Sequence, residues 1–310
     1  MPELPEVETV RRTLGERVLG RQVVGVRVSR PGVVYALNEG GRGPSRRIGK
    51  NRRRPAGEVT LRRALLEGER LARADRHGKQ LALIGGGGLG VCVHLGMSGS
   101  LCVVGPSPAT PSGEPGGPGG VKADHVHVVW QLDDGAEVWF RDPRRFGGLW
   151  TFESEAQLRQ TRWAKLGHDA LAITPGRLHA GLSRTQRDLK TALLDQQLVA
   201  GLGNIYVDEL LYTTRLHPQK IAATVTKAQS GRLVRAMRRI LGNAIAAGGS
   251  TLRDYVDATN QAGGYQTRFK AYGRAGQPCG RCGRAMESLI VAGRSTSACP
   301  ACQRGATPIG

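Results

Sequence analysis

Two pairs of cysteines near the end of the chain constrain its fold more than any other feature. Cys279 and Cys282 are followed, after sixteen residues, by Cys299 and Cys302. A C-x2-C pattern repeated at this distance is typical of a tetrahedral zinc site with four thiolate ligands. Because the protein fills all four positions around the metal, the spacing predicts one structural Zn2+ ion and no catalytic metal.

The sequence between the two cysteine pairs predicts a β-hairpin. Residues 288–291 and 295–297 have the composition of two short strands, and Ala292, Gly293 and Arg294 lie between them. So short a segment cannot bury a core of its own, and the bound metal would supply the order instead. We therefore expect Arg294 at the tip of a hairpin clamped by zinc.

The remaining sequence indicates a cytoplasmic protein. No apolar run reaches about 18 residues, the length needed to span a bilayer. The N-terminus carries three glutamates within its first eight residues and lacks the apolar core of a secretory signal. In a reducing compartment, cysteines are expected to be free or metal-bound. Cys92 and Cys102, far from the cluster in sequence, are then ordinary core or surface thiols.

The charge balance favours a polyanionic partner. Among 310 residues, 45 are Lys or Arg and 25 are Asp or Glu, which gives a net charge of +20. An excess of this size favours nucleic acid over a membrane surface as the partner. A generally basic proteome or a requirement for solubility would also explain it, so charge alone leaves both interpretations open.

The N-terminus offers a nucleophile if Met1 is removed. Proline is small enough at position two for Met1 to be trimmed, which would leave the secondary amine of Pro2 as the N-terminus. An α-amino group has a pKa of about 7.7–8.0, so part of it is unprotonated near neutral pH. Such an amine attacks a sugar aldehyde carbon to form an iminium, and Glu3 is placed to act as acid or base. The alternative is a proline that only starts a helix.

The chain length and patterning predict two domains and an α+β fold. Residues 1–152 contain an early helix, marked by Leu4, Val7, Val10 and Leu14, and then several segments that alternate apolar and polar residues. This pattern indicates a β-sandwich or barrel with one leading helix. Residues 153–310 carry helix-compatible segments at 156–162, 176–182, 188–197, 205–214 and 227–247, with the zinc finger at about 268–303.

Two segments of unusual composition interrupt the first domain. Residues 38–58 are rich in Gly, Pro and Arg, and are either a basic loop that contacts phosphate or an insertion without a role. Residues 105–120 are a Pro- and Gly-rich linker or long loop.

Several polar or bulky residues stand at expected turns. Lys79 follows Gly78 just before a strand, and Met97, Arg144 and Phe146 lie on glycine-containing loops. Side chains on such loops are candidates to enter a base stack, although each is also explained as core filling or as a solvated charge. Asn204 follows two glycines at an expected helix start, where backbone N–H groups can bind phosphate. A plain turn between two helices is the alternative.

Seven motifs in order resemble bacterial formamidopyrimidine-DNA glycosylase. They extend from the first residue to Gln303 and leave out the two unusual segments: MPELPEVETVRR, HGK, HLGMSG, DPRRFGG, LLDQQLVAGLGNIYVDE, YGRAGQPCGRCG and GRSTSACPACQ. The resemblance implies an N-terminal β-sandwich, a helix-two-turn-helix domain and a zinc-finger hairpin. It also implies an enzyme that removes oxidised purines, chiefly 8-oxoguanine and formamidopyrimidines, from double-stranded DNA and then cleaves the strand. The sequence gives no reason to expect an oligomer, so we expect a monomer.

The resemblance further implies a role for individual residues. Pro2 matches the nucleophile and Glu3 the catalytic acid. Lys79, Asn204 and Arg294 match residues that hold phosphates near the lesion. Met97, Arg144 and Phe146 match the residues that fill the vacated stack. Of these, Arg144 would face the orphan cytosine. Lys190 matches a DNA-binding position, and Glu209 another recurring one.

Two other functions remain open at the level of sequence. Endonuclease VIII-like enzymes share the N-terminal proline but remove oxidised pyrimidines; residues 4–8 (LPEVE) and the Arg144/Phe146 pair favour the purine enzyme. A non-catalytic, zinc-containing DNA-binding protein would need only the helical segment and the zinc hairpin. The intact Pro2-Glu3 start and Lys79 argue against it.

Overall fold

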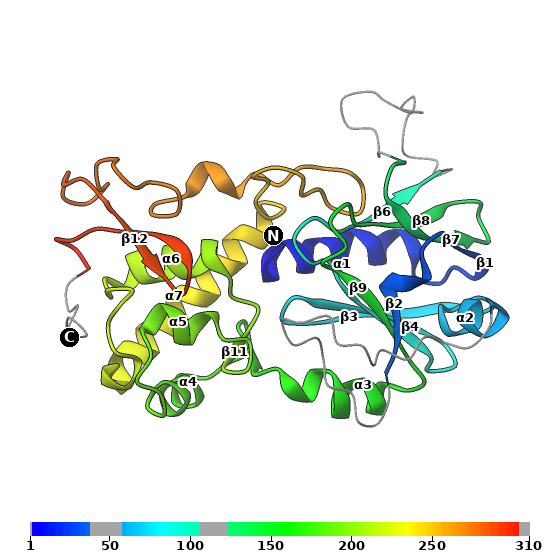
Figure 1. The fold of residues 1–310 in the computed structure, drawn as a ribbon, viewed down its shortest axis with the longest axis horizontal. Helices are drawn as coiled ribbons and strands as arrows, with labels where there is room; N and C mark the ends of the chain where they lie inside the picture. Colours follow the sequence, from blue (N-terminus) through cyan, green and yellow to red (C-terminus); the bar gives the residue numbers. More distant parts are fainter. Residues whose placement is uncertain (1, 38–57, 106–122, 304–310) are drawn as a thin grey trace. The chain divides into compact units, whose positions relative to one another are not determined.

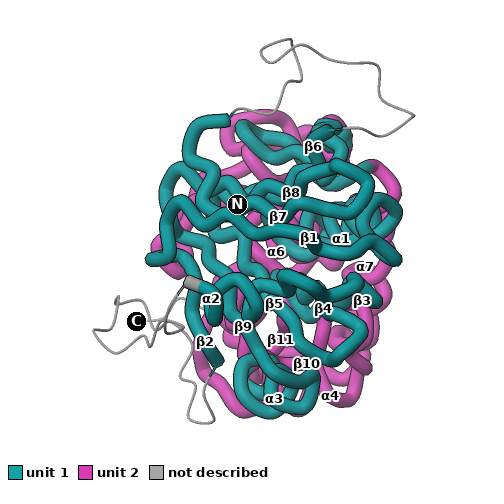
Figure 2. The backbone as a smooth tube through the Cα atoms, turned by 90° about the vertical axis from the view of Figure 1, so that its right-hand side faces the viewer, with its two compact units in different colours: residues 1–165, 248–264 teal, residues 166–247, 265–310 magenta. Residues whose placement is uncertain are grey.

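The computed structural model describes residues 2–37, 58–105 and 123–303, so the two unusual segments lie almost entirely outside the described residues. The chain forms two compact units (Figures 1 and 2): unit 1 is Met1–Lys165 with Gly248–Gly264, and unit 2 is Leu166–Ala247 with Tyr265–Gly310. This division differs from the single boundary expected between residues 152 and 153, because the chain returns to unit 1 for residues 248–264.

Unit 1 begins with helix α1, Leu4–Val18. Its apolar residues recur every three or four positions and are fully or almost fully buried: Leu4, Val7, Val10, Leu14 and Val18. The helix continues through Gly15 and ends at Val18. The reversal comes at Gly20, whose φ of 82° suits glycine.

A four-stranded antiparallel sheet forms one layer of unit 1. The strands are ordered β1-β7-β8-β6. Their bounds are Val23–Val28 for β1, Ser100–Val104 for β6, Val126–Leu132 for β7 and Glu137–Arg141 for β8.

A five-stranded sheet, ordered β2-β9-β5-β4-β3, forms the other layer. The strands are β2 (Val34–Ala36), β3 (Leu71–His77), β4 (Gln80–Gly85), β5 (Gly90–His94) and β9 (Gly148–Phe152). All neighbours are antiparallel except β2 and β9, which are parallel. The alternating segments of the sequence lie at 24–28, 81–83, 91–95, 126–132 and 138–140, so they did not reveal β2, β3, β6 or β9.

One hydrophobic core joins the two sheets and α1, which confirms the predicted sandwich. Buried side chains from both sheets and from α1 belong to it, among them Val10, Leu83, Val93, Trp130 and Phe140. Trp130 also donates its indole N–H to the carbonyl oxygen of Leu65, 2.8 Å away. Leu65 follows a second helix, α2 (Glu58–Ala64), so the expectation of a single early helix was wrong.

Helix α3 (Glu155–Thr161) lies near the end of the first segment of unit 1. Unit 2 is mainly helical. Its helices are α4 (Pro175–Leu182), α5 (Leu189–Leu194), α6 (Asn204–Thr214) and α7 (Lys227–Ala246), with α6 and α4 packed against α7 and α5 against α6. Between α5 and α6, β11 (Val199–Ala200) pairs in parallel with β10 (His168–Asp169). Helix α5 is shorter than the expected 188–197, because the backbone becomes extended at Asp195.

Short 3-10 segments complete the two units: η1 (Pro31–Val33), η2 (Trp163–Lys165), η3 (Ala222–Thr224) and η4 (Tyr265–Arg268). Among the described residues, no helix has the length and apolar character required to cross a bilayer.

The predicted hairpin is present in unit 2. Strands β12 (Glu287–Val291) and β13 (Arg294–Ala298) are antiparallel, and Val291 pairs with Arg294. The two turn residues, Ala292 and Gly293, have φ values of 53° and 67°. Two left-handed residues match the twist of a two-residue hairpin loop. Arg294 therefore lies at the tip, as expected.

Candidate active site and zinc centre

The Pro2-Glu3 start lies at the buried N-terminal end of α1. Pro2 is buried and Glu3 is 2 % exposed. The backbone N–H of Glu3 donates to Oε2 of Glu6 at 2.9 Å, and Oε1 of Glu6 accepts from the backbone N–H of Ser250 at 2.8 Å. The carboxylate of Glu6 thus fixes the first residues of the chain and ties them to the returning segment, 248–264. The sequence reasoning missed this role of Glu6.

Lys79 belongs to a cationic group in unit 1. It follows Gly78, whose φ is 58°, in the turn between β3 and β4, and it is 9 % exposed. Burial, together with the positive charges of Arg162 and Lys79, lowers the pKa of His94 to about 3. His94 is therefore neutral at physiological pH. Two cations beside a neutral imidazole suit an anionic ligand such as phosphate.

Arg162 completes this group at the C-terminal end of α3, where the sequence analysis had not placed a functional residue. It is 6 % exposed, and its Nε donates to Oε1 of Gln80 at 2.9 Å. Its guanidinium carbon lies 3.4 Å from the ring centroid of Trp150. An aromatic face and an amide oxygen thus hold the guanidinium in place.

The structure brings Met97, Arg144 and Phe146 together on two adjoining loops. Met97 and Phe146 are 45 % and 55 % exposed, unusually high for large apolar side chains. The guanidinium carbon of Arg144, which is also exposed, lies 4.6 Å from the ring centroid of Phe146. None of the three side chains fills the core, so the interpretation of these residues as core filling is excluded.

A buried carboxylate joins the two loops. Asp142 is fully buried; its Oδ1 accepts from the hydroxyl of Ser98 at 2.9 Å and its Oδ2 from the backbone N–H of Gly147 at 2.7 Å. At Gly96, with φ 63°, an added Cβ would overlap the backbone nitrogen of Gly147. The loops therefore touch backbone to backbone, which only glycine permits here.

In unit 2, the side chain of Asn204 contacts the hairpin that carries Arg294. Asn204 is the first residue of α6, and its Nδ2 donates to the carbonyl oxygen of Ser295 at 2.9 Å. Ser295 directly follows Arg294, which is partly exposed. The helix start and the hairpin tip, about ninety residues apart in sequence, thus lie side by side.

Lys190 does not lie where a DNA-contacting residue would. Its side chain is 0 % exposed, and its Nζ lies 2.5 Å from Oδ1 of Asp208 and 2.7 Å from Oγ1 of Thr296. A fully enclosed ammonium group cannot reach a phosphate directly. Lys190 instead joins α5, α6 and β13, and so supports the hairpin that carries Arg294.

Glu209, next to Asp208 on α6, fixes the backbone that leads to the cysteine cluster. Its carboxylate accepts from the backbone N–H groups of Lys270, Ala271 and Tyr272 at 2.8–3.0 Å. Three successive backbone donors on one carboxylate fix the path of the chain just before the cysteine cluster.

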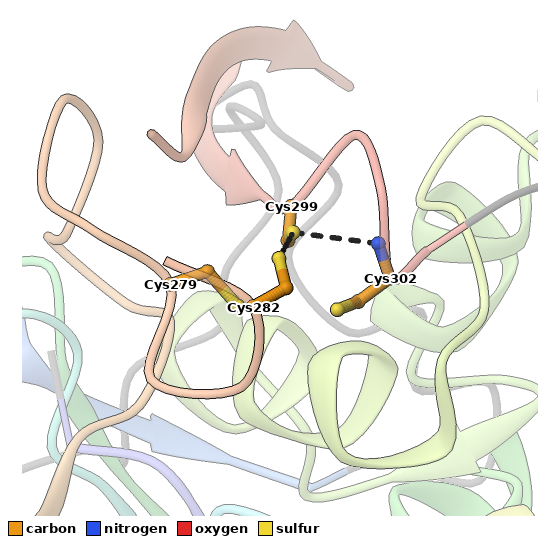
Figure 3. Close-up of side chains that lie close together, drawn as sticks. All are labelled: Cys279, Cys282, Cys299 and Cys302. Atoms are coloured by element: carbon orange, nitrogen blue, oxygen red, sulfur yellow. Dashed lines mark hydrogen bonds between the residues drawn. The ribbon is translucent and has the colours of Figure 1, made fainter. Parts of the chain in front are cut away.

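The four cysteines converge as predicted (Figure 3). The sulfur atoms of Cys279, Cys282, Cys299 and Cys302 all lie within 4.8 Å of one another. Tetrahedral zinc with Zn–S bonds of about 2.3 Å requires sulfur atoms about 3.8 Å apart, so the four donors fit the ion. Backbone N–H groups of Arg281 and Cys302 point at Sγ of Cys279 and Cys299, both at 3.4 Å. The protein holds one structural Zn2+ ion through these four cysteines.

Family models match most of the chain. The formamidopyrimidine-DNA glycosylase N-terminal domain matches residues 1–149, its H2TH domain matches residues 166–256, and the zinc finger found in FPG and IleRS matches residues 276–305.

Individual relatives agree over nearly their whole length. Formamidopyrimidine-DNA glycosylase of Cereibacter sphaeroides is 38 % identical over 308 residues, which cover 98 % of this chain and all of the relative. The enzyme of Bacillus cereus is 35 % identical over 305 residues, with 98 % and 99 % covered.

Solved structures show the same fold. MutM (FPG) of Thermus thermophilus superposes with a TM-score of 0.75 at 36 % identity, covering 97 % of this chain and 98 % of that one. Wild-type Lactococcus lactis Fpg, in complex with DNA containing N7-benzyl-Fapy-dG, gives 0.78 at 29 % identity, covering 98 % and 100 %. This chain is therefore a member of the formamidopyrimidine-DNA glycosylase family.

Proposed function

We propose that the protein excises oxidised purines, 8-oxoguanine and formamidopyrimidines, from double-stranded DNA and cleaves the strand at the resulting abasic site. The observation that carries the proposal is the N-terminal end of α1, where Glu3 is buried and its backbone is fixed by Glu6. A rigidly held acid next to a nucleophilic amine is what imine chemistry requires.

The nucleophile is the secondary amine of Pro2 after Met1 has been removed. Its lone pair attacks C1′ of the damaged nucleotide, the glycosidic bond breaks, and the base leaves with a proton. Glu3 supplies a proton as the sugar ring opens, and the product is an iminium between Pro2 and C1′. The zinc ion takes no direct part in these steps, because four cysteines fill its coordination positions.

Strand cleavage follows from the same iminium. The positive charge on nitrogen acidifies C2′, so loss of its proton expels the 3′ phosphate in β-elimination. A further proton loss expels the 5′ phosphate in δ-elimination. The result is a one-nucleotide gap with a phosphate at each end, and hydrolysis of the remaining imine frees Pro2.

Other residues hold the DNA while the base is extruded. Extrusion costs a few kcal/mol of stacking, which contacts to the gap and the flanking phosphates must offset. We assign phosphate contacts to Lys79, Asn204 and Arg294. The exposed group of Met97, Arg144 and Phe146 fills the vacated stack, with Arg144 toward the orphan cytosine. Lys190 acts indirectly, by supporting β13.

The enzyme would work as a monomer on duplex DNA in the cytoplasm, associated with the nucleoid. A chain of net charge +20 gains its affinity mainly from phosphates, so binding would weaken steeply with added salt.

Borohydride trapping tests both the mechanism and the substrate. Duplexes carry either 8-oxoguanine opposite cytosine or an oxidised pyrimidine, and wild type is compared with Pro2→Gly. We expect a covalent adduct that favours 8-oxoguanine and is lost in the variant. A preference for the oxidised pyrimidine would support the proposed mechanism but contradict the proposed purine substrate. DNA binding without any adduct, from protein with a verified free Pro2, would identify a binding module.

A tag placed at the N-terminus provides a matched control. It blocks the amine without changing any side chain, whereas the same tag at the C-terminus leaves the amine free. We expect trapping only with the C-terminal tag, and DNA binding with both.

A further inference from the structure

A basic pocket in unit 2 lies apart from all the residues assigned above. It has a volume of about 650 Å3 and lies between the C-terminal end of α6, Thr213–Leu216, and the face of α7 that carries Gln229, Arg232, Arg235, Ala236 and Arg239, with Lys220. This volume falls within the range of small-molecule sites, about 300–1,000 Å3. Asn204 is at the opposite end of the eleven-residue helix α6, about 15 Å away along its axis.

The lining of the pocket carries five positive charges and no negative one. The cations are Arg215, Lys220, Arg232, Arg235 and Arg239. Among the described residues, no carboxylate lies within ion-pairing distance of any of these five side chains. Among the described arginines of unit 2, only Arg187 has such a partner, Asp195 at 2.8 Å. The pocket therefore gathers five cations around one concavity, with no acidic side chain among its lining residues.

The arrangement of the cations is not explained by helix stability. Arg232, Arg235 and Arg239 recur at positions i, i+3 and i+7, which places them on one face of α7. They lie within the first thirteen residues of this twenty-residue helix, whereas cations are favoured near a C-terminal turn. Arg215 ends α6 with a φ of 59°, a left-handed position where glycine is usual.

We propose that this pocket is a binding site for an oligophosphate, separate from the site of base excision. Guanidinium groups bind phosphate oxygens through two parallel hydrogen bonds, and several of them around one concavity suit a run of phosphates. Both the DNA backbone and a free oligophosphate offer this chemistry.

The test uses inorganic tripolyphosphate as the probe and the full-length, zinc-loaded protein. Calorimetric titration compares wild type, the pocket variant Arg232→Gln/Arg235→Gln and a matched control, Arg184→Gln/Arg284→Gln. The control removes the same charge from exposed arginines of unit 2 outside the pocket. Zinc content is measured before and after titration, because polyphosphates bind metals.

We expect one saturable site in wild type and control, and binding weaker by about tenfold or more in the pocket variant, since hydrogen bonds to charged groups are lost. Absence of saturable binding in wild type, or equal weakening in both variants, would overturn the proposal. Titration in the presence of saturating undamaged duplex then separates the sources. If tripolyphosphate no longer binds when duplex is present, the DNA backbone is the ligand of the pocket. If tripolyphosphate still binds, the ligand is a free oligophosphate.

Discussion

The hydroxyl of Tyr212 lies 3.3 Å from Sγ of Cys279. Tyr212 is buried on α6, and the guanidinium of Arg281 lies 4.3 Å from the centre of its ring while donating to its backbone carbonyl oxygen. A phenol hydrogen donated to a thiolate stabilises the charged sulfur that zinc requires. The zinc centre is thereby fastened to the same helix whose first residue is Asn204.

Removal of this hydroxyl should weaken zinc binding. Groups that hydrogen-bond to metal ligands typically contribute about 10–100-fold to metal affinity, so we expect Tyr212→Phe to bind zinc about tenfold more weakly. Competition with a chelator measures the change. Tyr206→Phe, which removes a hydroxyl from the same helix, is the control and should retain wild-type affinity. Equal affinities in all three proteins would mean that the contact does not stabilise the thiolate.

Loss of the buried ammonium group of Lys190 should destabilise unit 2. Breaking a buried ion pair from one side costs about 3–5 kcal/mol, because the other charge stays buried without a partner. We expect Lys190→Met to lower the free energy of unfolding by about this amount, as measured by urea denaturation. Replacing both partners, Lys190→Met with Asp208→Leu, should recover part of it. A Lys190→Met protein of normal stability and weakened DNA binding would instead favour the original direct-contact interpretation.

A methyl group at Gly96 should separate the two loops that carry Met97 and Phe146. An added Cβ would overlap backbone atoms of Phe146 and Gly147, which cannot move independently of the strand that follows. We expect Gly96→Ala to lower stability by about 1–3 kcal/mol and to reduce excision more than abasic-site cleavage. Gly20→Ala is the control, because Gly20 also has a positive φ, 82°, but no atom within 4 Å of the added Cβ. Equal effects would point to backbone strain alone.

The carboxylate of Glu8 should make stability depend on pH in acid. Burial would raise the pKa of Glu8, but hydrogen bonds from Arg11, Arg12 and Arg76 outweigh it and lower the pKa to about 2. A carboxyl with a lowered pKa in the folded state stabilises the protein above its unfolded pKa and loses that contribution as pH falls. We expect Glu8→Gln to be less stable than wild type at pH 7, and the difference to shrink between about pH 4.5 and pH 2. A constant difference over this range would contradict the assignment.

The sequence predicted those features that depend on local spacing. The cysteine pattern predicted the zinc centre and the hairpin, and the helix-compatible patterning predicted the presence of α1 and, almost to the residue, the bounds of α7. Strands β2, β3, β6 and β9 were not predicted, because their buried positions depend on neighbouring strands. For example, β9 is buried at every position and therefore shows no alternation.

The sequence could not predict those parts of the candidate site that depend on contacts between residues far apart in the chain. The family resemblance gave Lys190 as a DNA-binding position. Its burial could not be predicted, because it depends on Asp208 and on Thr296, which is more than one hundred residues away. His94 and Glu6 lie inside motifs that were recognised, but nothing local marks the charge of Arg162 beside His94 or the bond from Ser250 to Glu6. The spacing of Glu3 and Glu6 at the start of α1, which is that of a capping box, is the local signal that would have identified the bond between Glu6 and the backbone of Glu3.

The return of residues 248–264 to unit 1 bears on how the protein is made. Beyond the bond from Ser250 to Glu6, the backbone N–H of Ala258 donates to Oγ1 of Thr13, and its carbonyl oxygen accepts from Val103. A ribosome synthesises Pro2, the proposed nucleophile, at the start and the residues that make these contacts near the end. A nascent chain therefore carries Pro2 through most of its synthesis before the contacts from residues 248–264 to α1 can form.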